Sequence, residues 1–178
     1  MKRLIIKAAY LVLALSAISC AKAVTEGPNE ASKRYFDAWM EINHPEAKPV
    51  GIGIYVLEEE EGNGAEVKED NYVYARYTIT DLEGNITSYT DEETAKQLGE
   101  YAPATYYGPK VITTFEKTIQ AGLGEAVLGM KVGGRKKIII PSWLTTYNSY
   151  ERADEYLENS SNGSSCISDI TITDVTSN

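Results

Sequence analysis

The chain of 178 residues is long enough for one domain of ordinary size, and its hydrophobic content of 43% is sufficient for a buried core. Its net charge is −9, and the residues after the first 19 hold 14 basic against 26 acidic side chains, which makes −12. This acidic balance argues against a nucleic-acid partner, because affinity for a phosphate backbone comes largely from lysine and arginine.

The first 19 residues have the layout of a secretion signal, in which three basic residues precede an apolar run at 8–18. That run is too short for a permanent transmembrane helix, which needs about 20 apolar residues. The sequence Leu-Ser-Ala-Ile-Ser-Cys that ends at Cys20 resembles a bacterial lipobox, apart from Ala17, where leucine is most common. The resemblance implies a lipid on Cys20 that anchors the protein to a membrane of the cell envelope, with its domain in the periplasm or at the cell surface. Ordinary secretion is the alternative.

A lipid on Cys20 would leave Cys166 as the only free thiol, so that no disulfide could form within the chain. Ile167 and Ile170 flank Cys166 in a strand-like run. This setting favours a small buried apolar side chain over a reactive thiol.

Residues 20–48 are predicted to be a lipidated tether followed by a helix, with Asn29 as a cap and prolines after residue 44 ending it. At helical spacing this segment places Ala31, Tyr35, Phe36, Trp39 and Ile42 on one face. We expect the face to pack on its own domain or on a second copy of the chain, as a homodimer. A helix that binds another partner is the alternative.

From residue 49 the pattern changes to short strands and turns. The strands expected from alternation and β-branched runs are 51–58, 72–80, 86–89, 135–140 and 166–175. Thr90 and Glu93 form a capping-box pattern for a short helix at 91–98, which Gly99 ends. The four acids at 58–61 lack the ligand spacing of a calcium loop, so we expect them to be solvated and to bind no metal.

A second helix precedes the strand at 135–140. One helical face carries its apolar residues, Ile119, Leu123, Ala126, Val127 and Met130. The pair Gly133-Gly134 is expected to break this helix, and Pro141 to end the strand that follows. The order of elements predicts an α+β fold, a curved antiparallel half-barrel of about five strands wrapped around a short helix, with an additional N-terminal helix.

The segment 122–141, GLGEAVLGMKVGGRKKIIIP, resembles the helix-to-strand segment of FKBP-type peptidyl-prolyl cis-trans isomerases, which typically reads G-W-x-E-G-L-x-G-M-K-V-G-G-x-R-x-x-x-I-P. Residues 73–78 look like the V-x-V-x-Y-T strand of that family, and 168–172 like its closing strand. The resemblance covers roughly 50 to 175, so residues 49–178 are expected to form an FKBP-like domain. The arrangement of a lipid-anchored tether followed by such a domain is similar to that of the lipoprotein members found in Gram-negative bacteria.

The resemblance implies the roles of individual residues. Those expected to be catalytic are Tyr77 and Tyr147, and those expected to bind substrate are Tyr107, Ile119, Gln120, Leu123 and Ile170. Within this set, Leu123 stands where the family has the tryptophan of the pocket floor. Tyr147 stands for the flap tyrosine that donates a hydrogen bond to a ligand carbonyl.

Other positions depart from the family pattern. Thr87-Ser88 replaces a Phe-Asp pair, Ser168 replaces a phenylalanine of the closing strand, and Tyr106 or Tyr107 is the substitute for an aromatic residue of a P-F-x-F segment. The expected function is isomerisation of X-Pro bonds in proline-containing polypeptides outside the cytoplasm. One alternative is an FKBP-fold peptide-binding or chaperone-like lipoprotein with little or no isomerase activity, and another is a purely structural envelope lipoprotein.

The sequence also bears on the chemistry. His44 is the only histidine and lies beside a proline, so a hydrolytic triad has no candidate base elsewhere. Isomerisation of a prolyl bond moves no proton, and an apolar cleft can assist it by disfavouring the polar resonance form of the amide. We therefore expect no cofactor.

Overall fold

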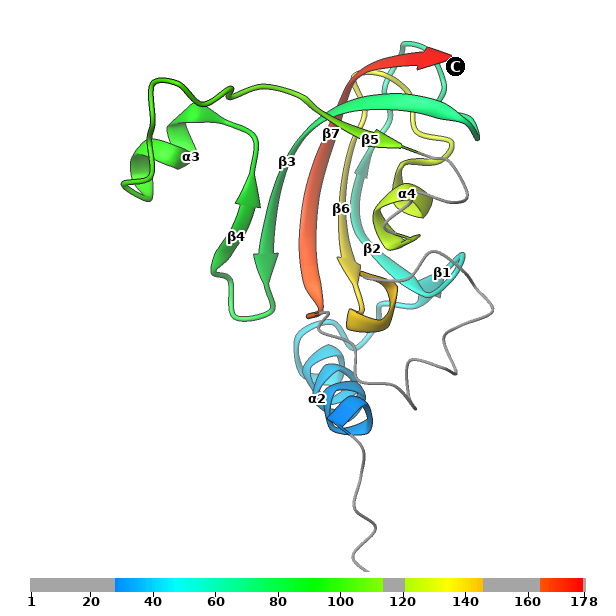
Figure 1. Ribbon diagram of the computed structural model, residues 1–178. Helices are drawn as coiled ribbons and strands as arrows, with labels where there is room; N and C mark the ends of the chain where they lie inside the picture. The colour runs from blue at the N-terminus through cyan, green and yellow to red at the C-terminus, as the bar shows by residue number, and fades with distance from the viewer. Residues whose placement is uncertain (1–27, 114–120, 146–163, 178) are drawn as a thin grey trace, which may run out of the picture.

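The computed structural model describes residues 28–113, 121–145 and 164–177 (Figure 1). Their sheet has the strand order β1-β2-β6-β7-β3-β4, with β5 paired to β3, and every pairing is antiparallel. The strands are β1 Pro49–Val50, β2 Ile54–Glu60, β3 Asn71–Asp81, β4 Ile86–Tyr89, β5 Lys110–Thr113, β6 Arg135–Ile140 and β7 Cys166–Ser177. The predicted curved antiparallel α+β fold is confirmed, with two more strands than expected because β1 and β5 are short additions.

The helices are α2 Pro28–Asn43, α3 Glu92–Gln97 and α4 Ala121–Val127, with a 3-10 helix, η1, at Ser142–Leu144. Figure 1 shows α4 inside the curve of the sheet and α2 near the ends of β6 and β7. In the part of the chain that the structure describes, no helix is long and apolar enough to cross a membrane.

The main core lies between α4 and the concave face of the sheet. Strand alternation places Val73 and Ala75 of β3 and Ile170 and Ile172 of β7 on this face, all fully buried or nearly so. From α4 the buried side chains are Leu123, Ala126 and Val127. Gly122 lets α4 approach closely, because a Cβ there would collide with the side chain of Ile140 in β6.

Helix α2 covers part of the convex face of the sheet. Phe36 and Met40 are buried against Ile139 of β6 and Leu82, which shows that the helix packs on its own domain. The predicted packing face was partly wrong, because Tyr35 and Ile42 are 52% and 79% exposed. The helix is rotated so that Phe36 and Met40, one turn apart, face the sheet. The hydroxyl of Tyr35 instead donates a hydrogen bond to Glu83.

Two predicted helix boundaries are corrected. Helix α2 begins at Pro28, so Asn29 lies inside its first turn and is not a cap, and proline suits that first position. Helix α4 ends at Val127, before Gly133-Gly134. The chain turns at Gly129, whose φ of 74° favours glycine, and Gly129 donates its backbone N–H to the carbonyl of Val67.

The acidic run 58–61 is exposed, as predicted, but it is also paired. Its carboxylates form ion pairs with Arg135, Lys136 and Lys137 of the neighbouring β6 and with Lys131. Arg135 further binds Asp169 of β7 through two hydrogen bonds of 2.8 and 2.6 Å. A single exposed ion pair contributes little to the free energy of unfolding. Opposite charges that face each other between β2 and β6, and between β6 and β7, nevertheless favour the observed strand register.

Helix α3 is capped by Asp91 and not by Thr90. The carboxylate of Asp91 accepts the backbone N–H of Thr94 at 2.8 Å, whereas the hydroxyl of Thr90 accepts the backbone N–H of Tyr77. Thr90 is used to join β3 to the segment after β4, so the residue that follows it becomes the cap. Hydrogen bonds from the side chain of Thr94 and, more weakly, from its backbone N–H lower the pKa of Asp91 below its ordinary value.

Replacing Asp91 with alanine is expected to reduce the free energy of unfolding by about 1 kcal/mol at neutral pH, the usual cost of losing such a cap. Because the pKa of Asp91 is lower in the folded state, its stabilisation is present above the unfolded pKa of about 3.9 and is lost as pH falls through the folded value. Urea unfolding of Asp91→Ala and Asp91→Asn at pH 7 and pH 3 measures this. The asparagine keeps a cap without a charge, so an equal loss in both variants at pH 7 would contradict the role of the side chain as a cap.

Candidate functional site

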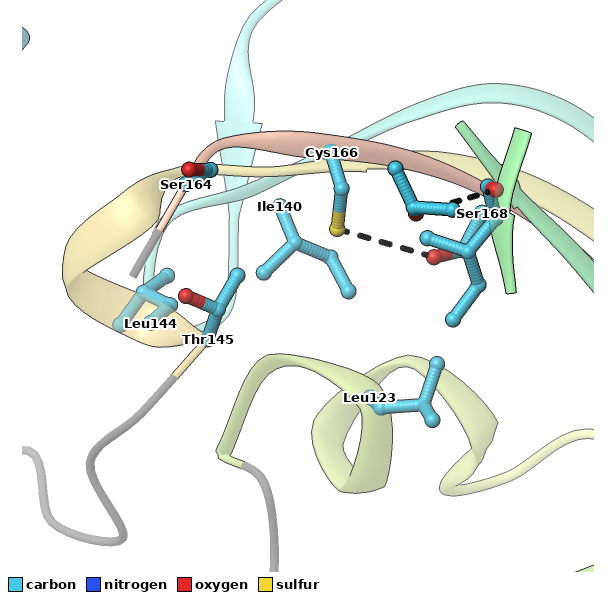
Figure 2. A pocket seen from close by; sticks show the side chains of 9 residues that line it. Leu123, Ile140, Leu144, Thr145, Ser164, Cys166 and Ser168 are labelled. Carbon is cyan, nitrogen blue, oxygen red and sulfur yellow. Dashed lines mark hydrogen bonds between the residues drawn. The ribbon is translucent and has the colours of Figure 1, made fainter. Parts of the chain in front are cut away.

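A pocket of about 250 Å³ lies between α4 and one end of the concave face (Figure 2). Four of its lining side chains are aliphatic and five carry a hydroxyl or a thiol. The lining residues are Ile79, Thr87, Leu123, Ile140, Leu144, Thr145, Ser164, Cys166 and Ser168. They come from β3, β4, α4, β6, η1 and β7 and from residues next to η1 and β7, so the pocket depends on much of the fold.

Strand register explains why these residues meet. Ile79 of β3 pairs with Ser168 of β7, and Cys166 pairs with Ile140 of β6. Since residues two apart in a strand share a face, Cys166 and Ser168 both point toward α4. Figure 2 shows Leu123 of α4 across the cavity from this wall.

The polar groups of the pocket differ in how well they are satisfied. The hydroxyl of Thr87 donates to the carbonyl of Ile79 at 3.2 Å, and that of Thr145 donates to the carbonyl of Ser142 at 2.8 Å. Ser168 is fully buried, and its hydroxyl lies 3.9 Å from the sulfur of Cys166. Sulfur is a weak hydrogen-bonding partner, so Ser168 is the least well satisfied of the three hydroxyl groups.

Cys166 is partly buried and forms part of the pocket wall. Burial raises the pKa of its thiol above the ordinary value, and the hydrogen bond with Ser168 opposes this more weakly. At neutral pH the thiol is therefore protonated. This agrees with the predicted role of a small, unreactive side chain, although it faces a cavity and is not fully enclosed.

The residues predicted from sequence are distributed unevenly around this pocket. Leu123 lines it. Tyr77 and Ile170 are cross-strand partners one step along the sheet from Ile79 and Ser168. Ile170 is fully buried in the main core and Tyr77 is partly buried against it, so they border the pocket without lining it.

Tyr107 lies elsewhere, in the segment between α3 and β5. Its ring stacks on Tyr101 with centroids 5.7 Å apart, and its hydroxyl accepts the backbone N–H of Ala102. Ile119, Gln120, Tyr147 and Cys20 lie outside the described residues, so their roles stay predictions.

Three of the positions that depart from the family pattern converge on the pocket. Thr87, Leu123 and Ser168 come from β4, α4 and β7, yet all three line the same cavity. Neither Tyr106 nor Tyr107, the expected substitutes, lines it, nor does Tyr89, next to Ser88 of β4. Tyr89 donates its hydroxyl to Glu100, Tyr106 is 69% exposed, and Tyr107 is held by its stacking partner as described above. At these three positions the side chains are smaller than in the family pattern, and two of them carry a hydroxyl.

Sequence reasoning did not single out Ile79, Ile140, Leu144, Thr145 or Ser164 as pocket residues. For Ile79 a signal existed, because alternation in β3 places it on the face of Tyr77. Ile140 ends an uninterrupted apolar run, which does not reveal its face. Leu144, Thr145 and Ser164 lie at or next to the ends of η1 and β7, where the sequence shows no alternation or helical spacing that would mark them. Among the residues that the structure describes, no cluster of three or more histidine, cysteine or acidic side chains could hold a metal ion.

Comparison with known proteins agrees with this fold. No protein-family model matches the chain. The short-type peptidyl-prolyl cis-trans isomerase of Methanocaldococcus jannaschii is 33% identical over 75 residues, which are 42% of this chain and 47% of that protein. The match therefore spans about half the length of this curated relative.

Two solved structures share the fold at low sequence identity. FkpA from Escherichia coli has a TM-score of 0.53 and 20% identity, and the match covers 97% of this chain and 72% of FkpA. A peptidyl-prolyl cis-trans isomerase from Pseudomonas syringae pv. tomato has a TM-score of 0.57 and 19% identity, and the match covers 85% of this chain and 98% of that one. The chain thus has an FKBP-like fold. Over the 75 matched residues the sequence is also similar to a peptidyl-prolyl cis-trans isomerase.

Proposed function

We propose that the protein is a peptidyl-prolyl cis-trans isomerase that assists the folding of extracytoplasmic proteins, and that it binds X-Pro segments in the pocket between α4 and the sheet. The observation that carries the proposal is the position of this pocket, against Leu123 and next to Tyr77 and Ile170, where the family resemblance predicted substrate binding. The isomerase name of the curated relative supports the same reaction.

The pocket has properties that suit this reaction. Rotation about an X-Pro bond faces a barrier of about 18–20 kcal/mol, because the planar amide is stabilised by resonance. The aliphatic wall formed by Ile79, Leu123, Ile140 and Leu144 removes water from a bound prolyl amide. Loss of water disfavours the polar resonance form, and a site that binds the twisted amide better than either planar form lowers the barrier. No acid, base or cofactor is required.

The cellular setting is part of the proposal. The lipobox-like sequence supports a lipid on Cys20, which would hold the domain at a membrane of the cell envelope while the pocket stays in water. Proline-containing polypeptides outside the cytoplasm would then be its clients. Dimerisation through α2 stays a prediction, and the exposed Tyr35 and Ile42 are the side chains of α2 that remain for it.

The experiment is a protease-free measurement of cis-trans exchange in a short X-Pro peptide by two-dimensional NMR. The purified chain is expected to accelerate exchange, and Tyr77→Ala and Tyr147→Phe are expected to reduce the acceleration. Tyr74→Ala is the matched control for the first variant, because Tyr74 lies on the same strand, three residues away and on its other face. Acceleration no greater than that given by an inert protein would refute the proposed reaction.

A second function has one observation in its favour. Because Thr87, Leu123 and Ser168 replace large aromatic residues, the pocket retains space and hydroxyl groups that suit peptide binding without strong catalysis. A peptide-binding or chaperone-like protein would suppress aggregation of an unfolded client while leaving exchange at its uncatalysed rate. Light scattering of a refolding client, measured beside the NMR assay, distinguishes the two functions.

A further inference from the structure

Residues 89–107, which lead from the end of β4 through α3 toward β5, present aromatic side chains to water. They hold four tyrosines, and two of these, Tyr101 and Tyr106, are 43% and 69% exposed. Leu98 is exposed in the same segment. None of the residues 89–107 lines the pocket, and Figure 1 shows α3 beyond β4, apart from α4. Large apolar side chains exposed close together mark a binding surface, whereas single ones do not.

Contacts within the segment hold its tyrosines in place. The rings of Tyr101 and Tyr107 stack with their centroids 5.7 Å apart, and the hydroxyl of Tyr107 accepts the backbone N–H of Ala102 at 3.0 Å. Tyr89 donates its hydroxyl to Glu100 at 2.9 Å. Aromatic rings that are already ordered lose little entropy when a partner binds, so this arrangement suits recognition.

The tyrosines lie among acidic side chains. Residues 89–107 contain four acids and one base, Lys96, which makes a net charge of −3. The Nζ of Lys96 lies 2.8 Å from a carboxylate oxygen of Glu92 and 5.3 Å from the centroid of the Tyr101 ring. The hydrogen bond with Glu92 and, further, the charges of Glu92 and Glu93 raise the pKa of Lys96. The segment therefore already holds one cation between a carboxylate and the face of a tyrosine.

Charge decides which partner suits this surface. A second copy of the chain would bring the same acidic segment against it, and like charges that face each other in an interface are destabilising. A basic polypeptide would instead place cationic side chains against ring faces and carboxylates, as Lys96 does. Arginine suits such a site best, because its planar guanidinium stacks on aromatic rings and can bind a carboxylate through two hydrogen bonds.

We propose that residues 89–107 form a second binding surface, separate from the pocket, which takes extended polypeptide segments rich in arginine. The inference goes beyond the proposed function, because neither the pocket nor a proline takes part in the contact. A client bound at the pocket could be held at this surface as well, through a basic segment elsewhere in its chain.

The test is fluorescence anisotropy with the purified chain and a labelled peptide of alternating arginine and serine, which contains no proline. The peptide is expected to bind at low ionic strength and to bind less tightly as salt is added, because exposed charges are screened. The lysine counterpart is expected to bind more weakly, since an ammonium group has no planar face to stack. Failure of the arginine peptide to bind, or equal affinity for the lysine peptide, would refute the proposal.

An aromatic variant locates the surface. Combining Tyr101→Ala with Tyr106→Ala is expected to weaken binding of the arginine peptide about tenfold, the effect of losing two cation–π contacts at exposed rings. Tyr35→Ala is the matched control, because Tyr35 is also exposed and also contacts a carboxylate, that of Glu83, but lies on α2. An equal loss of affinity in the control would overturn the assignment to residues 89–107.

A pair of charge variants separates this surface from general attraction to an acidic chain. Glu93→Gln and Glu46→Gln each remove one exposed carboxylate, and only Glu93 belongs to the surface. Glu93→Gln is expected to weaken binding of the arginine peptide about threefold, as for one exposed ion pair, and Glu46→Gln to leave it unchanged. Equal losses in the two variants would contradict a defined surface.

Two further measurements distinguish the remaining outcomes. If sedimentation shows a dimer that dissociates in the double tyrosine variant, a second copy covers the surface and the proposal is wrong. The exchange assay separates the proposal from the isomerase. Binding of the arginine peptide without acceleration of X-Pro exchange would support this surface and refute the proposed function, and acceleration without such binding would do the opposite.

Discussion

Replacing Phe36 with alanine is expected to lower the free energy of unfolding by about 3–5 kcal/mol, the range for a fully buried aromatic side chain. Phe36 is 1% exposed and fills the space between α2 and the convex face of the sheet. Its ring lies 5.7 Å from that of Tyr55 and 5.3 Å from that of Trp143, the latter edge-on. Loss of the ring would remove both aromatic contacts and leave a cavity beneath the helix.

The same substitution is expected to weaken peptide binding, because Trp143 connects α2 to the pocket. Trp143 packs against both the α2 cluster and the main core, and it lies in η1 beside Leu144, which lines the pocket. Without Phe36, one side of Trp143 loses its packing contact, and the part of the pocket wall formed by η1 is held less rigidly. The additional helix would thus serve the site as well as the fold.

Chemical denaturation and peptide titration of Phe36→Ala and Tyr35→Ala measure both effects. Tyr35 is the matched control, because it is the neighbouring aromatic residue of the same helix and is half exposed. Its loss is expected to change stability by less than about 1 kcal/mol, in line with other surface substitutions. Similar unfolding curves for the two variants would show that α2 does not depend on Phe36.

Much of the fold was predictable because several strands carry strong local patterns. The hairpin partner 86–89 and the strand 135–140 have the predicted boundaries, and β3 extends the predicted 72–80 by one residue at each end. Alternation of polar and apolar residues is a local signal, so it can be recognised in the sequence without knowledge of the tertiary structure. The rotation of α2 was less predictable, because aromatic residues occupy more than one side of that helix. The face that packs is decided by the sheet beneath it.

The pocket was predictable only in part. The resemblance singled out Leu123, which lines the pocket, and it marked Thr87 and Ser168 as departures, but it did not indicate that the three share one cavity. That they line one cavity follows from the pairing of Ile79 with Ser168 and from the place of β4 at the sheet edge, which are long-range facts. The cap at Asp91 shows the same limit, since Thr90 fits the capping pattern but is already bonded to Tyr77.

Leu123→Trp tests whether the empty space of the pocket determines its selectivity. Leu123 is 8% exposed and forms the α4 side of the pocket, so a larger ring there would occupy space that a client side chain otherwise fills. A peptide with a large side chain before the proline, such as a phenylalanyl-prolyl peptide, is expected to bind about tenfold more weakly, because the indole ring would take up space in the pocket and overpacking costs roughly 1–3 kcal/mol. Exchange of an alanyl-prolyl peptide is expected to rise relative to that of the phenylalanyl peptide, because an aromatic floor contacts the prolyl ring when no larger side chain competes for the space.

The control for this prediction is Leu128→Trp, which adds the same ring just after the end of α4, at a partly buried position that does not line the pocket. Both variants add equal bulk, so a general loss of stability would affect the two peptides alike in each of them. Only a change at the pocket would move the ratio of the two exchange rates in Leu123→Trp and leave it constant in Leu128→Trp. A ratio unchanged in both variants would mean that the space beside Leu123 is not where the client's side chain binds, and that selectivity arises at another part of the concave face.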